Sequence, residues 1–137
     1  SGDDSNVLPH ISIGATGMIS VTANIAPHAY RQIVDATNRN DFHSALKVHN
    51  ALEPLQRAIM THVPGTVAAK YVLHGLGFIG SPRVRLPLVG PEDHEAALIE
   101  GGIDQVVSVP GVSFDNFRPD RNAAAGGALP KVAGTTR

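Results

Sequence analysis

One short apolar segment limits the folds open to this 137-residue chain more than any other feature. Residues 17–21, Gly-Met-Ile-Ser-Val, are the clearest candidate strand, and their nearly continuous apolar character is typical of a strand buried in a parallel sheet. A lone parallel strand has no neighbour for its backbone hydrogen bonds. Either the strand prediction is wrong, or the chain is the C-terminal piece of a larger protein. The direct entry from Ser1 into a Gly-Asp-Asp turn favours the second interpretation.

Helical patterns flank this segment. A short helix is expected over residues 6–13, begun by the acidic turn before it and ended by Gly14. With the strand that follows, it makes the loop–helix–strand unit that repeats in barrels and doubly wound sheets. A second helix is expected over residues 27–38, because Pro27 suits a first helical position and an apolar side follows it.

The middle of the chain predicts further helices. Asp41 is a suitable N-cap, and apolar residues then recur at spacings of three and four from 45 to 59. Pro54 interrupts this pattern, which indicates either a kinked helix or two helices. Residues 66–76 form the next expected helix, and a last one opens at 91–95 and closes near Gly101-Gly102.

Composition excludes several classes of function. Eleven basic residues against twelve acidic ones argue against a nucleic-acid partner or a polybasic membrane contact. The absence of Cys excludes a disulfide scaffold, a zinc–thiolate site and a cysteine nucleophile. No apolar run approaches the roughly 20 residues that span a bilayer. The seven histidines show no metal-ligand spacing, and Gly14–Gly17 lacks the features of a phosphate-binding loop, so we expect neither a metal nor a cofactor.

Five stretches together resemble the C-terminal part of the dihydrodipicolinate synthase family, a class I aldolase-like group of pyruvate-dependent enzymes. The resemblance covers residues 1–103 and is carried by Ser1–Asp4, Gly14–Pro27, Leu52–Leu55, Lys70–Leu73 and Arg85–Leu88. It implies an α/β fold, namely the C-terminal part of a (β/α)8 TIM barrel followed by a C-terminal helical extension. Residues 1–26 would be the last βα units and 27–103 the final barrel helix and helical domain. The small-residue composition of 104–137 predicts a disordered tail.

The resemblance also implies an activity. Enzymes of this kind condense pyruvate with aspartate semialdehyde, on the route to lysine and diaminopimelate, through a lysine Schiff base and a tyrosine proton relay. Both residues lie on earlier strands in the family and are expected upstream of Ser1. The implied protein is a cytoplasmic homotetramer, a dimer of dimers.

Lysine usage tests this expectation independently. A Schiff-base lysine needs an environment that deprotonates its amine, and in a barrel it lies at the C-terminal end of a strand. Lys47 and Lys70 fall in expected helices and Lys131 in the expected tail. The segment alone should therefore lack the nucleophile and be inactive.

Three residues remain as candidates for contact with substrate. By the resemblance, the backbones of Gly2 and Ile19 approach the bound keto acid. Alternatively, Gly2 only permits a tight turn and Ile19 only fills the barrel interior. Asp3 is a candidate for contact with the amino group of the second substrate, and capping of the first helix by Asp3 or Asp4 is the alternative.

Two further functions stay open. An N-acetylneuraminate lyase or a 2-keto-3-deoxy sugar acid aldolase would share the fold and the pyruvate chemistry. A non-catalytic helical module for oligomerisation is the alternative from another class.

Overall fold

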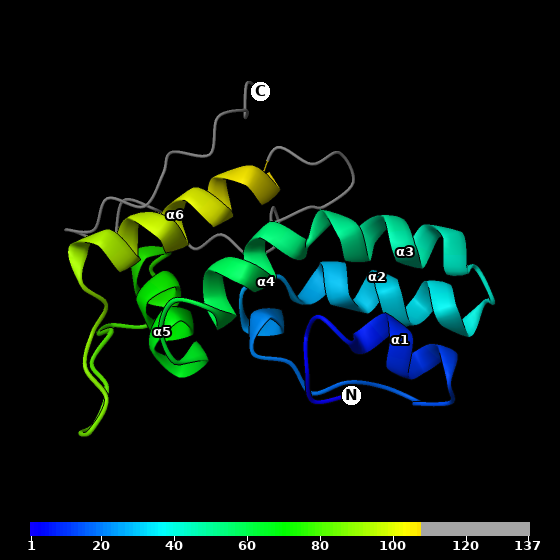
Figure 1. The fold of residues 1–137 in the computed structure, drawn as a ribbon, viewed down its shortest axis with the longest axis horizontal. Coiled ribbons are helices and arrows are strands. Elements are labelled where there is room, and N and C mark those ends of the chain that lie inside the picture. The colour runs from blue at the N-terminus through cyan, green and yellow to red at the C-terminus, as the bar shows by residue number, and fades with distance from the viewer. Residues whose placement is uncertain (108–137) are drawn as a thin grey trace.

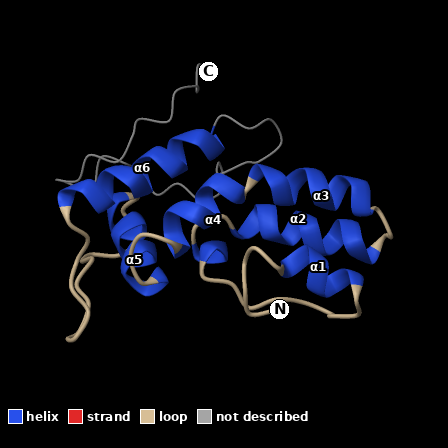
Figure 2. Ribbon diagram, in the orientation of Figure 1, coloured by secondary structure: helices blue, strands red, loops and turns tan. Residues whose placement is uncertain are grey.

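The computed structural model describes residues 1–107, and every regular element in that range is helical (Figures 1 and 2). In chain order these elements are α1 (Val7–Ser12), the 3₁₀ turn η1 (Thr22–Asn24), α2 (Pro27–Asn38), α3 (Phe42–Ala51), α4 (Glu53–Met60), α5 (Gly65–Gly75) and α6 (Asp93–Val107). α2 packs along α3, and α4 packs along α6 and against α5. Figure 1 shows that α4 continues from α3 and links the α2–α3 pair to the α5–α6 pair.

A single apolar core joins these helices. Leu55 and Ile59 of α4 have no solvent exposure, and neither have Ile33 of α2 and Ile99 of α6. Since each helix contributes its apolar stripe to the same cluster, burial of these side chains is the main force that orders the helices.

The expected strand over residues 17–21 is not formed, and no residue of 1–107 is assigned to a strand. The α/β architecture expected from the sequence is therefore not seen in this part of the chain, which is helical. The physical reason lies in pairing, because a strand is held by its neighbours. Among residues 1–107, the backbone of this segment bonds only to Ser1 and, in the turn that follows, to Asn24.

The proline at position 54 marks a junction between two helices. Leu52 is both the C-terminal boundary of α3 and the N-terminal boundary of α4, and Pro54 occupies the first turn of α4. A proline is tolerated there because the first N–H groups of a helix have no intrahelical partner. Of the two alternatives, the structure shows two helices. Asp41 caps α3 as expected, accepting a hydrogen bond from the Ser44 amide at 3.0 Å.

The last helix extends beyond its expected end. α6 passes through Gly101 and Gly102 and ends at Val107, so the expected start of the tail at 104 falls within a helix. Gly102 is placed directly against α4, and packing at that contact outweighs the low helix propensity of glycine. The rest of the expected tail, 108–137, lies outside the described residues.

Candidate functional site

The N-terminal segment pairs with residues 17–19 through two backbone hydrogen bonds. The Ser1 amino group donates to the carbonyl oxygen of Gly17, and the Ile19 amide donates to the carbonyl oxygen of Ser1, both at 2.7 Å. One residue thus bonds to two residues that flank a single position on the opposite segment. This is the hydrogen-bond pattern of a parallel pair of strands. Residues 1–2 and 18–20 therefore run side by side in the same direction.

Gly2 directly follows Ser1, and Ile19 is the last bonded residue of the opposite segment. Gly2 is exposed, its φ is outside the left-handed region, and a Cβ added there would meet nothing within 4 Å. A tight turn that requires glycine therefore does not explain Gly2. Ile19 is 86% exposed, so its side chain does not fill an interior layer in the described part of the chain.

Asp3 stabilises the turn that precedes α1. Its Oδ1 atom accepts hydrogen bonds from the Ser5 amide at 2.9 Å, the Asn6 amide at 3.1 Å and the Ser5 hydroxyl at 2.6 Å. These bonds satisfy donors just before α1, where the helix boundary residue Asn6 provides no side-chain cap. The Ser5 hydroxyl bond, with smaller help from the two amides, lowers the pKa of the Asp3 carboxyl. Contact between Asp3 and a substrate stays a prediction.

Asp4 is buried, unlike its neighbour. It is 3% exposed, and its Oδ2 atom accepts hydrogen bonds from both the amide of Thr22, at 2.9 Å, and the Thr22 hydroxyl. The Oδ1 atom is also buried and has no hydrogen-bond partner among the described residues. From the sequence, Asp4 was a candidate for capping or for substrate contact. Its bond to Thr22 was not predicted, because Thr22 lies eighteen residues away and no local pattern links the two.

A buried tyrosine extends this polar cluster toward α4. Tyr30 of α2 is 3% exposed, and its hydroxyl accepts a hydrogen bond from Nε2 of Gln56 at 3.1 Å. Burial, together with the charge of Asp4, raises the pKa of Tyr30 to about 12. Tyr30 was expected only as part of an apolar helix side, and Gln56 was not singled out at all.

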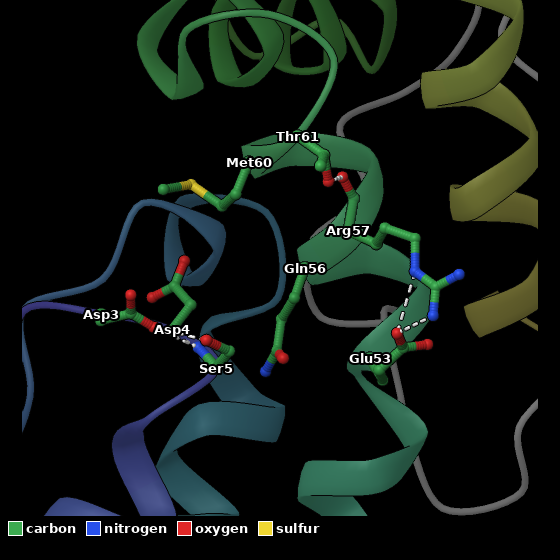
Figure 3. Close-up of a pocket in the computed structure, with 8 residues that line it drawn as sticks. All are labelled: Asp3, Asp4, Ser5, Glu53, Gln56, Arg57, Met60 and Thr61. Carbon is green, nitrogen blue, oxygen red and sulfur yellow. Dashed lines mark hydrogen bonds and ion pairs between the residues drawn. The ribbon is translucent and has the colours of Figure 1, made fainter.

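An open cleft of about 270 Å³ separates the acidic turn from α4. Figure 3 shows Asp3, Asp4 and Ser5 on one side of the cleft and side chains of α4 on the other. Among the latter, Arg57 and Glu53 form an ion pair one helical turn apart. The residues on both sides of the cleft are mostly polar, with Met60 as the apolar exception, and Gly2 directly precedes Asp3 in sequence.

Two other kinds of feature are missing from residues 1–107. No cluster of three or more His, Asp or Glu side chains in residues 1–107 is arranged to hold a metal ion. Within the same range, no helix combines the length and the apolar character needed to cross a membrane.

Comparison with known proteins gives consistent matches. Residues 1–105 match the model of the dihydrodipicolinate synthetase family. The 4-hydroxy-tetrahydrodipicolinate synthase of Cereibacter sphaeroides is 44% identical over 103 residues, which cover 75% of this chain and 35% of that protein. The chain therefore spans about a third of the length of the curated relatives it matches.

Solved structures give the same match in three dimensions. The 4-hydroxy-tetrahydrodipicolinate synthase of Methylacidiphilum fumariolicum superposes with a TM-score of 0.73 at 28% identity, covering 77% of this chain and 35% of that one. The dihydrodipicolinate synthase of Thermotoga maritima also gives 0.73, at 26% identity and with the same coverage of 77% and 35%. The resemblance found in the sequence is confirmed, and the chain belongs to the dihydrodipicolinate synthetase family.

Proposed function

We propose that this chain supplies the C-terminal part of a (β/α)8 barrel and its helical extension to a 4-hydroxy-tetrahydrodipicolinate synthase. The reaction would join pyruvate to aspartate semialdehyde through a lysine Schiff base, as a step toward lysine and diaminopimelate. The observation that carries the proposal is the parallel backbone pair between Ser1 and residues 17–19, in a chain that matches this family over residues 1–105.

The geometry supports a substrate-facing role for Gly2 and Ile19. Both lie at the C-terminal end of the parallel pair, and barrel enzymes form their active sites at the C-terminal ends of parallel strands. At Gly2 neither backbone conformation nor packing requires glycine, and space is open where a side chain would stand. A bound keto acid would use that space to reach the backbone.

The nucleophile would come from another part of the protein. Lys70 donates from Nζ to the carbonyl oxygen of Arg83 at 2.5 Å, and Lys47 lies on the helix α3. Neither lies on the segments that carry Gly2 and Ile19, and Lys131 is outside the described residues. The Schiff-base lysine and the relay tyrosine are proposed upstream of Ser1, and a homotetramer and a cytoplasmic location are part of the same proposal.

Borohydride trapping tests this assignment. The 137-residue chain, incubated with pyruvate and borohydride, should keep its mass, whereas the protein expressed from its natural gene should gain one reduced pyruvate adduct. A stable adduct on Lys47 or Lys70 would refute the assignment of the nucleophile. Turnover of aspartate semialdehyde rather than N-acetylneuraminate by the natural protein separates the synthase from the lyase of the same family.

The Gly2→Ala variant tests the substrate-facing role. We expect unchanged thermal stability, because the added Cβ meets nothing within 4 Å, together with weaker binding of pyruvate. Equal pyruvate KM values for wild type and variant would contradict the role given to Gly2.

A further inference from the structure

The buried carboxyl of Asp4 joins the same two chain segments that carry the proposed keto acid site. The backbone pair between Ser1 and residues 17–19 connects them at one point. The hydrogen bonds from Thr22 to Asp4 Oδ2 connect them again, three residues further along each segment. Gly2 lies between these two connections, and Ile19 takes part in the first of them. The two connections therefore hold both backbones in place.

Burial of the Asp4 carboxyl costs free energy and makes the Asp4–Thr22 contact rigid. A carboxyl group loses its hydration when it is buried, and only hydrogen bonds or a charge partner offset that loss. Asp4 is 3% exposed, but its Oδ1 atom has no partner among residues 1–107, so the compensation comes entirely through Oδ2 and Thr22. A purely structural contact at this place would be served as well by an apolar pair. The Asp4–Thr22 contact, unlike an apolar pair, fixes a defined donor–acceptor geometry between the two segments.

Thr22 is in turn held in place by the surrounding helices. Thr22 has no solvent exposure and opens η1, which contacts α2, α4 and α5. Tyr30 of α2 lies close enough to Asp4 to feel its charge and is bonded to Gln56 of α4. The Asp4–Thr22 contact is thus held in a packed frame, while Asp3 next to it is exposed and bonds only to nearby residues.

We infer that Asp4, through Thr22, is a positioning residue that sets the spacing of the Gly2 and Ile19 backbones and so the affinity for the keto acid. This inference rests on the proposed function. Binding through backbone groups acts on the ground state as well as on the transition state, so its loss raises KM and leaves kcat nearly constant. Displacements of about 1 Å at a binding site cost up to about a hundredfold in activity.

The test compares variants of the protein expressed from its natural gene. Thr22→Val keeps the shape and the backbone amide but removes the hydroxyl, and Thr22→Ser keeps the hydroxyl. Thr37→Val is the matched control, because Thr37 is also buried but its hydroxyl bonds only to the Val34 carbonyl within α2. We expect Thr22→Val to raise the pyruvate KM about tenfold with kcat within about twofold, Thr22→Ser to restore KM, and Thr37→Val to leave KM unchanged.

A merely structural role would give a different result. It would lower the folded fraction, and hence kcat per mole of protein, without moving KM. A folded Thr22→Val variant with the wild-type KM overturns the inference. Should that variant fail to fold, Thr22→Ala replaces it, since it also removes the hydroxyl that donates to Asp4, and an unchanged KM in a folded Thr22→Ala variant overturns the inference equally. Absence of any pyruvate-dependent turnover in the wild type would instead refute the proposed function.

Discussion

Two neighbouring glycines of α6 have very different surroundings, which provides a sharp test of how this helix packs. A Cβ added at Gly102 would lie 2.3 Å from Cβ of Ala58 and 2.9 Å from the carbonyl oxygen of Pro54, both on α4. A Cβ added at Gly101 would meet nothing within 4 Å. Replacing each glycine by alanine therefore gives a matched pair in one helix, in which only Gly102→Ala forces α4 and α6 apart.

The magnitude follows from two opposing terms. Replacing a glycine by alanine inside a helix stabilises it by about 0.5–1 kcal/mol, and this gain is common to both variants. Carbon atoms pack at about 3.5–4.0 Å, so the contact with Ala58 would be more than 1 Å too short. Overpacking of this kind costs about 1–3 kcal/mol. We expect Gly101→Ala to be slightly more stable than wild type and Gly102→Ala to be about 1–3 kcal/mol less stable than Gly101→Ala.

Urea unfolding followed by circular dichroism measures this difference. The double variant Gly102→Ala with Ala58→Gly removes one of the two close contacts, so a double-mutant cycle should show favourable coupling between the sites. If Gly102→Ala is as stable as Gly101→Ala, the close approach of α4 and α6 is not real. Additive effects of Gly102→Ala and Ala58→Gly would also contradict the assigned contact.

Three further predictions concern side-chain hydrogen bonds and titration. The chain has two tyrosines, and burial above all raises the pKa of each, Tyr30 and Tyr71, from 10.0 to about 12. Because folding raises these pKa values, the stabilisation of the folded state is complete below pH 10 and is lost as the pH rises through about 12. Absorbance at 295 nm should therefore show no tyrosinate in the folded protein at pH 10, and tyrosinate should form there only when the protein unfolds. Tyr71→Phe breaks the 2.6 Å bond from the Tyr71 hydroxyl to Glu100 that joins α5 to α6, and should cost about 1 kcal/mol in urea unfolding, whereas an unchanged midpoint would show that the bond contributes nothing. The hydrogen bonds from Ser44 lower the pKa of Asp41, so its stabilisation of α3 should be present above the ordinary aspartate pKa and be lost as the pH falls through the lowered pKa. The Asp41→Ala variant should therefore have a lower Tm than wild type at pH 7 and a weaker dependence of Tm on acid pH. Parallel profiles of Tm against pH for variant and wild type would contradict the capping role of Asp41.

Most helices could be predicted because their signals are local. The 27–38 helix, the Asp41 cap and the helix ending near 76 depend on residues within one or two turns of each other, and the structure places them as expected. Pro54 was ambiguous, because a proline inside an apolar pattern is compatible with a kink as well as with a new helix. The choice between them depends on the packing of α4 against α6, which no pattern in the sequence contains.

The two failures have the same physical origin. Gly101-Gly102 predicts a helix end by propensity, but the helix continues because α4 comes too close to Gly102 for any side chain to fit there. Residues 17–21 have strong strand character, but strand formation depends on partners rather than on propensity, and in residues 1–107 the segment pairs with Ser1. In the first case a tertiary contact accompanies a helix that the sequence does not predict, and in the second the lack of strand partners prevents a strand that the sequence does predict.

The residues of the candidate site also differ in whether they could be predicted from the sequence. Gly2 and Ile19 were identified through the family resemblance, which encodes spatial proximity that spacing alone does not reveal. The burial of Asp4 was not predicted, because its partner Thr22 lies eighteen residues away. Tyr30 and Gln56 are likewise twenty-six residues apart. Each of these residue types is ordinary in its local context, and a buried polar cluster becomes visible only when distant segments are brought together. The adjacent carboxyls at positions 3 and 4 thus have separate structural roles. The exposed Asp3 satisfies amides in the turn before α1, while the buried Asp4 joins the N-terminal segment to Thr22.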